Sequence, residues 1–276
     1  MSDFGHDTPE LAERYDLISD SQLEKGGLLI RRMGIEAGNR VLDVGCGTGR
    51  LTLLVSQTVG PSGFVLGIDP SEHRIKAACD KLTSHEPRNV HFGVGIAEDL
   101  HSLPDSAFDH IYYSSVLHWV VDKPAALREA FRVLAPGGKI GITTADRDNP
   151  QTLQAITSRV FIKAPYAGQV RPEADARQPV SRAELVALLK EAGFQNIEVE
   201  LHERKRLHPT AEDALQYAES TSTGRLFNHV PDSLRVRARQ DVAEELEKTR
   251  TTEGIPVSNS SLLVVAIKPQ LSPLTS

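Results

Sequence analysis

The sequence predicts an α/β protein built on a doubly wound, mainly parallel sheet. Short apolar runs of strand length alternate with amphipathic segments of helical length through the first half of its 276 residues, which is the pattern of such a sheet. The first apolar run opens into a loop with glycine at every second position, residues 45–49, and the second closes on an acid, Asp69. At this length we expect one large domain with insertions rather than two independent domains.

The composition argues against several classes of protein. The 31 basic and 37 acidic residues give a net charge of −6, which disfavours a protein whose main task is binding nucleic acid. The polar N-terminus does not have the pattern of a signal peptide, and the apolar run 262–267 is too short to span a bilayer. With only Cys46 and Cys79, we expect a reducing compartment, no disulfide framework and no metal site. These features together favour a cytoplasmic protein without a nucleic-acid or membrane partner.

The elements of the first half follow from hydrophobic spacing and from helix caps. Ser71 is placed to cap a helix, and Pro124 stands in the first turn of another. The run Pro136, Gly137, Gly138 ends that helix and turns the chain into a further strand. The predicted helices are 19–33, 50–59, 71–82 and 123–134, and the predicted strands are 41–44, 64–68, 90–94, 108–113 and 139–144.

The second half interrupts this alternation twice. Residues 146–180 are rich in Pro, Gly and Ala, and residues 207–254 carry two further helical patterns. Between them a capping box at Ser181 opens a helix that ends at Gly193, and strands follow at 197–201 and 262–268. We interpret 146–180 and 207–254 as insertions that cap the sheet and select the molecule acted on.

The glycine-rich loop predicts a nucleoside site. Backbone amides at a helix N-terminus attract negative charge, and glycines allow a ligand to lie on the main chain. Asp69 is placed about twenty residues later to accept hydrogen bonds from ribose hydroxyls. The loop alone is weak evidence, because dinucleotide oxidoreductases share it. Their pattern is G-x-G-x-x-G, however, whereas this chain has G-x-G-x-G preceded by Asp43.

An ordered set of short blocks carries a family resemblance. VLDVGCGTG, GIDPS, GIAEDL, FDHIYYSSVLHW and REAFRVLAPGGKI together resemble the class I S-adenosylmethionine-dependent methyltransferases. The resemblance implies a Rossmann-like, seven-stranded sheet whose last strand is antiparallel, with S-adenosylmethionine as the cofactor and no metal. It divides a single methyltransferase domain, 1–276, into an N-terminal helical lid, 1–34, a cofactor-binding core, 35–145, and the two cap insertions.

The same resemblance implies roles for individual residues. Asp43 orients the loop and the amino group of the cofactor, Asp69 takes the ribose hydroxyls, and Gln22 belongs to the lid over the cofactor. Many relatives carry Asp before Ala-Glu, where this chain has Ile96, so recognition of the adenine amino group depends more on the backbone and on Glu98 or Asp99. The other implied cofactor-binding residues are Gly45, Cys46, Gly47 and Gly49 beneath methionine and ribose, Pro70, Ala97 and Glu98 around the adenine, and Ser114 and Ser115 at the methionine end.

The residues after the fourth strand limit the class of acceptor. Methyltransferases that act on amino groups of adenine or glutamine typically have Asp/Asn-Pro-Pro-Tyr there, whereas this chain has Ser-Ser-Val-Leu, which favours a small-molecule acceptor. The candidate catalytic residues are His118 as a proton acceptor, Trp119 as a pocket wall and Tyr15 in the lid.

The chain as a whole resembles fungal small-molecule thiol S-methyltransferases, which include the enzyme that methylates the dithiol form of gliotoxin. The similarity lies in YDLISDSQLEKG, the Leu-His-Trp turn and the helical insertions. Gln22 and Trp119 also resemble those of juvenile hormone acid methyltransferases, which act on a carboxylate. The expected function is therefore S-methylation of a dithiol metabolite. Carboxyl or hydroxyl O-methylation, and a methyltransferase-like regulator that acts through partner proteins, remain alternatives.

Overall fold

The computed structural model describes residues 20–82, 89–170, 178–221, 226–227 and 230–270. The part of the predicted lid that precedes residue 20 lies outside these residues. It includes Tyr15 and Ser19. The chain divides into two compact units, each considered by itself below. Unit 1 comprises Met1–Asp146, Gln178–Leu201 and Leu262–Ser276, and unit 2 comprises Arg147–Arg177 and His202–Ser261.

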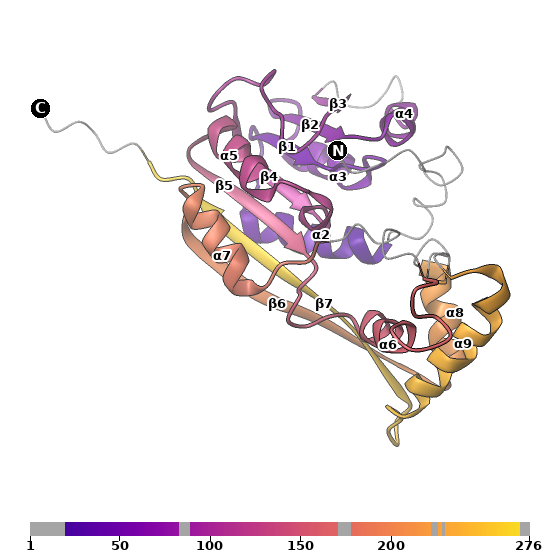
Figure 1. Ribbon diagram of the computed structural model, residues 1–276. Helices are drawn as coiled ribbons and strands as arrows, with labels where there is room; N and C mark the ends of the chain where they lie inside the picture. Colours follow the sequence, from indigo (N-terminus) through magenta and orange to yellow (C-terminus); the bar gives the residue numbers. More distant parts are fainter. Residues whose placement is uncertain (1–19, 83–88, 171–177, 222–225, 228–229, 271–276) are drawn as a thin grey trace, which may run out of the picture. The chain divides into compact units, whose positions relative to one another are not determined.

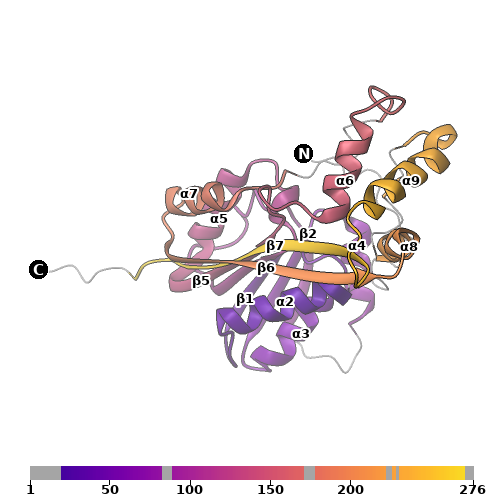
Figure 2. The ribbon, with the colours of Figure 1, turned by 90° about the horizontal axis from the view of Figure 1, so that it is seen from below.

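The sheet has seven strands in the order β3-β2-β1-β4-β5-β7-β6 (Figures 1 and 2). Strands β1 to β5 pair in parallel, and β7 runs antiparallel to β5. The predicted fold class, a Rossmann-like sheet with an antiparallel last strand, is therefore confirmed. The strands are β1 Arg40–Val44, β2 Phe64–Asp69, β3 Val90–Val94, β4 Phe108–Ser114, β5 Leu134–Thr144, β6 Gln195–His208 and β7 Ile255–Ile267.

Helices cover both faces of the sheet in unit 1. Helices α2 (Asp20–Met33) and α3 (Arg50–Val59) pack on one face, and α5 (Lys123–Val133) and α7 (Arg182–Glu191) pack on the other (Figure 2). Helix α4 (Glu72–Asp80) packs beside β2 and β3. Strands β1, β2, β4 and β7 therefore bury side chains on both faces, which explains why they are apolar runs rather than alternating ones.

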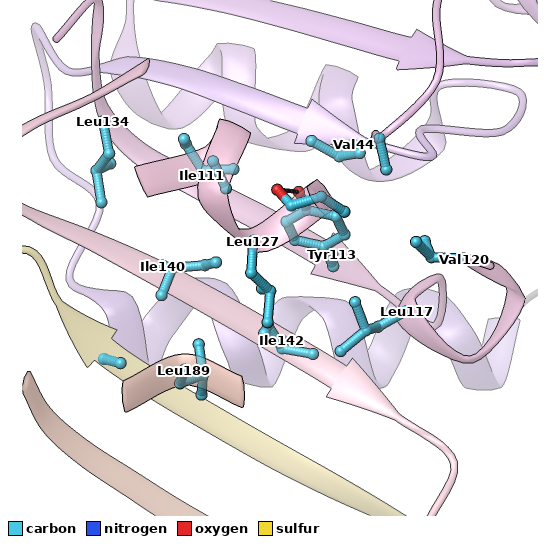
Figure 3. Packing of buried hydrophobic residues seen from close by; sticks show 14 of the residues in the cluster. Val44, Ile111, Tyr113, Leu117, Val120, Leu127, Leu134, Ile140, Ile142 and Leu189 are labelled. Atoms are coloured by element: carbon cyan, nitrogen blue, oxygen red, sulfur yellow. Dashed lines mark hydrogen bonds between the residues drawn. The ribbon is translucent and has the colours of Figure 1, made fainter. Parts of the chain in front are cut away.

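Successive residues of strand β4 pack on opposite faces of the sheet. Ile111 and Tyr113 join the cluster under α5 and α7, whereas Tyr112 joins the cluster under α2 and α3. Figure 3 shows Leu127 of α5 and Leu189 of α7 beside strand residues of the first cluster. Because successive side chains of a strand point to opposite faces, Tyr112 carries its hydroxyl to the face that also carries Asp43.

The predicted helix caps are observed. Ser71 accepts a hydrogen bond from the Arg74 amide at the start of α4, and Ser181 accepts one from the Glu184 amide at the start of α7. Asp122, which was not among the predicted caps, also caps α5, with the predicted Pro124 in its first turn. These local signals are readable from sequence because each requires only neighbours three residues apart.

Three strand boundaries differ from the prediction. Strand β5 begins at Leu134, because the Pro136–Gly137–Gly138 turn is absorbed as an irregularity between the pairs Phe108–Leu134 and His110–Lys139. Strands β6 and β7 extend beyond the predicted 197–201 and 262–268 and continue into unit 2. The extension 202–208 is mostly exposed and charged, so hydrophobic spacing does not reveal it.

Unit 2 has a hydrophobic core of its own. Helices α6 (Thr152–Phe161), α8 (Ala211–Thr221) and α9 (Asp232–Glu247) surround it. The Phe161 ring lies 5.4 Å from that of Tyr166 and 6.4 Å from that of Phe227, between centroids. These aromatic side chains pack against one another. Among the described helices of both units, none combines the length and the apolar character needed to cross a membrane.

Gly141 of β5 sets how closely α2 approaches the sheet. A Cβ at this position would overlap the Met33 sulfur and lie 3.1 Å from Leu29 Cδ1. We expect Gly141→Ala to lower the free energy of unfolding by about 1–3 kcal/mol, because α2 must shift to admit one methyl group. Thermal unfolding followed by circular dichroism measures this effect. The matched control is Gly93→Ala in β3, whose new Cβ would meet no atom within 4 Å. Equal losses in the two variants would contradict the packing argument.

Candidate cofactor and methyl-transfer site

The loop between β1 and α3 has a backbone that only glycine adopts readily. Gly45, Gly47 and Gly49 have φ angles of 75°, 57° and 78°, in the region that disfavours residues with a Cβ. Space excludes a side chain as well. A Cβ at Gly45 would overlap Val116, and one at Gly49 would lie 2.6 Å from Phe92 Cζ.

The end of β2 holds this loop in place. The amides of Gly45 and Cys46 both donate to the Ile68 carbonyl, at 2.7 and 2.9 Å. The Gly47 amide donates to Oδ2 of Asp69 at 2.9 Å. Cys46 is half-buried, and its sulfur lies where a Cβ on Gly67 would approach within 3.0 Å. Three successive amides of the loop are therefore fixed by the last two residues of the neighbouring strand.

Asp69 is a buried carboxylate at the tip of β2, 4% exposed. Its Oδ1 accepts a hydrogen bond from the Ser71 amide at 3.0 Å, and Ser71 in turn caps α4. The backbone amides of Gly47 and Ser71 are thus both donors to this carboxylate, one to each oxygen. Pro70, which follows it, is half-buried. The carboxylate is thus oriented by the backbone, as an acceptor for ribose hydroxyls needs to be.

Asp43 is the second buried acid, 2% exposed on β1. Its Oδ2 accepts hydrogen bonds from the hydroxyls of Thr52 and Tyr112, each at 2.7 Å. Burial nevertheless raises the pKa of Asp43 from 3.8 to about 7, because desolvation outweighs the two hydrogen bonds, and the charge of Asp69 acts in the same direction. Without a cation beside it, Asp43 therefore takes up a proton near neutral pH.

The predicted adenine-side residues lie in the turn after β3. Ile96 and Asp99 form an isolated bridge, and Ala97 between them is buried. Oε1 of Glu98 accepts a hydrogen bond from the Val121 amide at 3.2 Å. Asp99 accepts one from the backbone amide of His101. Glu98 therefore connects this turn to the segment that follows β4.

The predicted methionine-end residues close the carboxyl end of β4. Ser115 has a φ of 62°, and its amide donates to the carbonyl and the hydroxyl oxygen of Thr143, both at 2.9 Å. This bend carries Val116 against Gly45. Ser114 is half-buried, and a Cβ on Gly26 of α2 would lie 3.1 Å from its hydroxyl oxygen.

Gln22 lies one turn before Gly26 on α2, on the stripe that continues to Ile30 and Met33. Residues four apart share a helix face, and Ile30 and Met33 are buried in the sheet cluster. Gln22 is half-buried. Because Gly26 lies beside Ser114, this stripe carries Gln22 toward the carboxyl ends of the strands.

His118 and Trp119 stand in the 3-10 turn η1, Leu117–Trp119. His118 is buried, and its Nδ1 accepts a hydrogen bond from the Ala145 amide at 3.3 Å and lies 3.2 Å from the Thr144 hydroxyl oxygen. A backbone N–H can only donate, so Nδ1 carries a lone pair and the ring proton of neutral His118 is on Nε2. The half-buried Trp119 ring has its centroid 5.4 Å from that of His118.

The described residues form two groups at the carboxyl ends of the central strands. One group joins Asp43, the glycine loop and Asp69. The other joins Ser115, Val116 and the η1 turn, and the Val116–Gly45 contact connects the two groups. Sequence reasoning missed Thr52, Tyr112, Thr143 and Ala145, because nothing in their local pattern shows that other parts of the chain donate to, or accept from, these groups. The glycine cradle and the two acids fit a nucleoside that carries hydroxyls and an ammonium group.

The buried Asp43 makes stability depend on pH. Below its ordinary pKa of 3.8 the carboxyl is protonated in both the folded and unfolded chain, whereas the folded protein keeps the proton up to about pH 7. Stability is therefore lost as the pH rises from about 4 to about 7. We expect Asp43→Asn to remove this loss, which is on the order of a few kcal/mol, while Asn still accepts from Thr52 and Tyr112.

The check is urea unfolding of the ligand-free wild type and Asp43→Asn at a series of pH values. The surface acid Asp80, paired with Lys76 on α4, supplies the control variant Asp80→Asn. Parallel curves for wild type and Asp43→Asn would show that Asp43 ionises at its ordinary pKa.

Comparison with known proteins connects this geometry to a family. A family model described as a methyltransferase domain matches residues 35–193. The ubiquinone/menaquinone biosynthesis C-methyltransferase UbiE of Vibrio campbellii is 35% identical over 204 residues, which cover 67% of this chain and 78% of that protein. A demethylmenaquinone methyltransferase of Listeria monocytogenes is 30% identical over 178 residues, 61% of this chain and 75% of that protein.

Solved structures share the fold at lower identity. The YcgJ protein of Bacillus subtilis has a TM-score of 0.63 at 22% identity and covers 90% of this chain and 99% of its own. The phosphoethanolamine N-methyltransferase 2 of Haemonchus contortus, in complex with S-adenosylmethionine, has a TM-score of 0.63 at 18% identity over 95% of this chain and 58% of its own. The fold, the cradle and the matching family model agree: this chain is a class I S-adenosylmethionine-dependent methyltransferase.

Proposed function

We propose that the protein methylates a thiol of a small dithiol metabolite. The observation that carries the proposal is the hydrogen bond from the Ala145 amide to Nδ1 of His118. The sequence suggests a proton acceptor at His118, but this bond uses the lone pair that would take the proton. A nucleophile that ionises without a positioned base fits such a site best.

The chain's own residues bind and align. Bound S-adenosylmethionine supplies an electrophilic methyl group on its sulfonium sulfur. In the proposed arrangement Asp69 accepts from the ribose hydroxyls, Asp43 faces the ammonium group, and the cradle of Gly45, Gly47 and Gly49 supports the cofactor from below. Ile68 and Pro70 border the adenine, with Ala97 and Glu98 along its edge. Ser114, Ser115 and Gln22 then enclose the methionine end, so that alignment and exclusion of water supply the rate.

Other titratable groups near this site are occupied. The Tyr112 hydroxyl donates to Asp43, and burial raises its pKa well above the ordinary value. The Tyr113 hydroxyl donates to the Ala126 carbonyl, and burial raises its pKa also. Neither phenol is suited to accept a proton at neutral pH.

The ordinary acidity of the nucleophile then decides between acceptors. A thiol with a pKa of about 8.5 is about 3% ionised at pH 7, whereas a phenol with a pKa of about 10 is about 0.1% ionised. Without a base, this difference favours the thiol by about thirty-fold. A carboxylate is fully ionised and needs only positioning, but it is a weaker nucleophile than a thiolate. Cys46 and Cys79 are both free thiols, which fits the reducing cytoplasm that we propose as the location.

Acceptor selection is assigned to the capping segments. The chain leaves unit 1 after Asp146, directly after Thr144 and Ala145, which hold the His118 ring. We propose that 146–180 and 207–254 select the acceptor, with Trp119 as a wall of its pocket and Tyr15 as part of the lid.

Methylation of a quinol ring carbon is the second candidate. It is favoured by the relatives named as quinone C-methyltransferases, the first of which is 35% identical. A ring carbon becomes nucleophilic when the neighbouring phenol ionises, so this reaction needs the base that His118 is not placed to supply. Carboxyl O-methylation is the third reaction to be tested.

We expect Asp69→Asn to weaken cofactor binding at least tenfold, because charge-assisted hydrogen bonds to the ribose become neutral ones worth about half as much. Calorimetric titration with S-adenosylhomocysteine measures the affinity. Asp80→Asn is the matched control, since it removes an acid from α4 outside the loop. Unchanged affinity in Asp69→Asn would remove this residue from the proposed site.

We expect methyl-labelled cofactor to label dithiols in preference to carboxylic acids and quinols, as detected by mass spectrometry. The rate with a dithiol should rise with pH toward the pKa of the thiol, about 8.5. Label on a quinol carbon alone would establish the second candidate instead, and label on a carboxylate alone would establish the third.

The variant His118→Gln tests whether His118 only accepts the hydrogen bond from Ala145 or also acts as a base. Its side-chain oxygen can accept from the Ala145 amide but does not titrate. The wild type and this variant should have the same pH profile with a dithiol, because the nucleophile ionises by itself. Loss of the pH-dependent limb in the variant would identify His118 as the base.

A further inference from the structure

The η1 turn is held from outside by a residue distant in sequence. The Gln178 amide donates to the His118 carbonyl at 2.6 Å, while the Ala145 amide donates to the His118 ring. His118 is thus hydrogen-bonded at its backbone and at its ring by two different segments of unit 1. Since η1 has only three residues, these bonds decide where the His118 and Trp119 rings lie.

Lys123 completes this arrangement from the start of α5. Its side chain is buried, with the residue 6% exposed, and Nζ donates to the Val120 carbonyl at 2.9 Å and to Oε1 of Gln178 at 3.3 Å. Val120 is the residue on which η1 ends. The ammonium group of Lys123 therefore connects Val120, at the end of η1, to Gln178, which hydrogen-bonds His118 in the middle of η1.

Burying the Lys123 ammonium group costs desolvation free energy, which stabilising the start of a helix does not require. Desolvation lowers the pKa of Lys123, and the acids Glu184 and Glu98 act against this only through their charge. Asp122 and Pro124 already provide α5 with a cap and a favourable first turn, so the helix does not need Lys123 to begin. The two acceptors of its ammonium point to a function in holding the turn.

We call Lys123 and Gln178 the clamp. The chain connectivity places Gln178 where the chain re-enters unit 1. The chain leaves unit 1 after Asp146 and returns to it at Gln178. Asp146 forms a bridge with Val180 just after the carboxyl end of β5, close in sequence to Thr144 and Ala145, which contact the His118 ring.

We propose that Lys123 and Gln178 are positioning residues for methyl transfer, which hold η1 so that His118 and Trp119 face the acceptor in one arrangement. This proposal rests on the proposed function in one respect, namely that the turn lies at the transfer site. A displacement of about 1 Å in such a positioning element can lower a rate by about a hundred-fold. Among the described residues, the hydrogen bonds of Lys123 and Gln178 go to each other, to Val120 and to His118, and not to Asp69 or the glycine loop, so we expect cofactor binding to change little.

The experiment uses Trp119, which is the only tryptophan of the chain and therefore reports the turn by its fluorescence. The variants are Lys123→Met, which keeps the length of the side chain without a donor, and Gln178→Ala, which removes only the side-chain acceptor at an exposed position. Lys123→Arg restores a charged donor. The matched control is Lys139→Met, which removes another lysine that donates to a backbone carbonyl, that of Met33, on β5.

We expect Lys123→Met to shift the Trp119 emission and to increase its quenching by acrylamide. Its kcat with the accepted substrate should fall about ten- to a hundred-fold, while its Kd for S-adenosylhomocysteine stays within about twofold of wild type. Gln178→Ala should give a smaller change in the same direction, Lys123→Arg should recover most of the rate, and Lys139→Met should leave the fluorescence unchanged.

Unchanged Trp119 fluorescence in both Lys123→Met and Gln178→Ala would overturn the clamp, as would a loss of cofactor affinity equal to the loss of kcat. If Lys123→Met does not fold, Gln178→Ala alone decides between these outcomes. The fluorescence measurement needs no acceptor, so an error in the proposed dithiol would leave the clamp result intact. Conversely, altered fluorescence with unchanged kcat would show that the turn does not position the reaction.

Discussion

The hydrogen bond from the Gly47 amide to the Asp69 carboxylate is the interaction on which the site depends. It connects the loop after β1 to the tip of β2, and the Ile68 carbonyl reinforces it by accepting from Gly45 and Cys46. The same carboxylate accepts from Ser71 and so places the start of α4. One buried acid thereby shapes the cradle and the start of α4, and in the proposed binding mode it also accepts from the ribose hydroxyls.

Burial of the Asp43 carboxyl lowers the stability of the ligand-free protein at a position that the proposed binding mode uses. Burial raises its pKa to about 7 although two hydroxyls donate to it, so the ligand-free protein holds an acid in an unfavourable environment. An ammonium group beside it would favour the ionised form, because an opposite charge offsets desolvation. In the proposed binding mode, binding of a cationic ligand beside Asp43 would therefore be coupled to release of its proton.

At the proposed transfer end, backbone bonds hold the η1 turn and the His118 ring. The positive φ of Ser115 and its bonds to Thr143 turn the chain sharply, and Val116 then packs on Gly45. The amide of Ala145 fixes the tautomer of His118. Displacement at a sulfonium methyl requires an aligned nucleophile and little water, and a site rigidly built from backbone bonds meets that requirement when the nucleophile ionises unaided.

The sequence by itself determined what depends on near neighbours. The glycine spacing, Asp43 and Asp69 predicted the cradle, hydrophobic spacing predicted most of the strands and the fold class, and Ser71 and Ser181 mark helix starts that need only local bonds. Tertiary structure alone decided the partners of those residues. The proton position on His118 depends on Ala145, the place of η1 depends on Lys123 and Gln178, and the pKa of Asp43 depends on Tyr112 and on burial. Apart from the local bond of Lys123 to Val120, these features come from contacts between residues 27 to 69 apart, or from solvent exclusion, and neither leaves a local pattern in the chain.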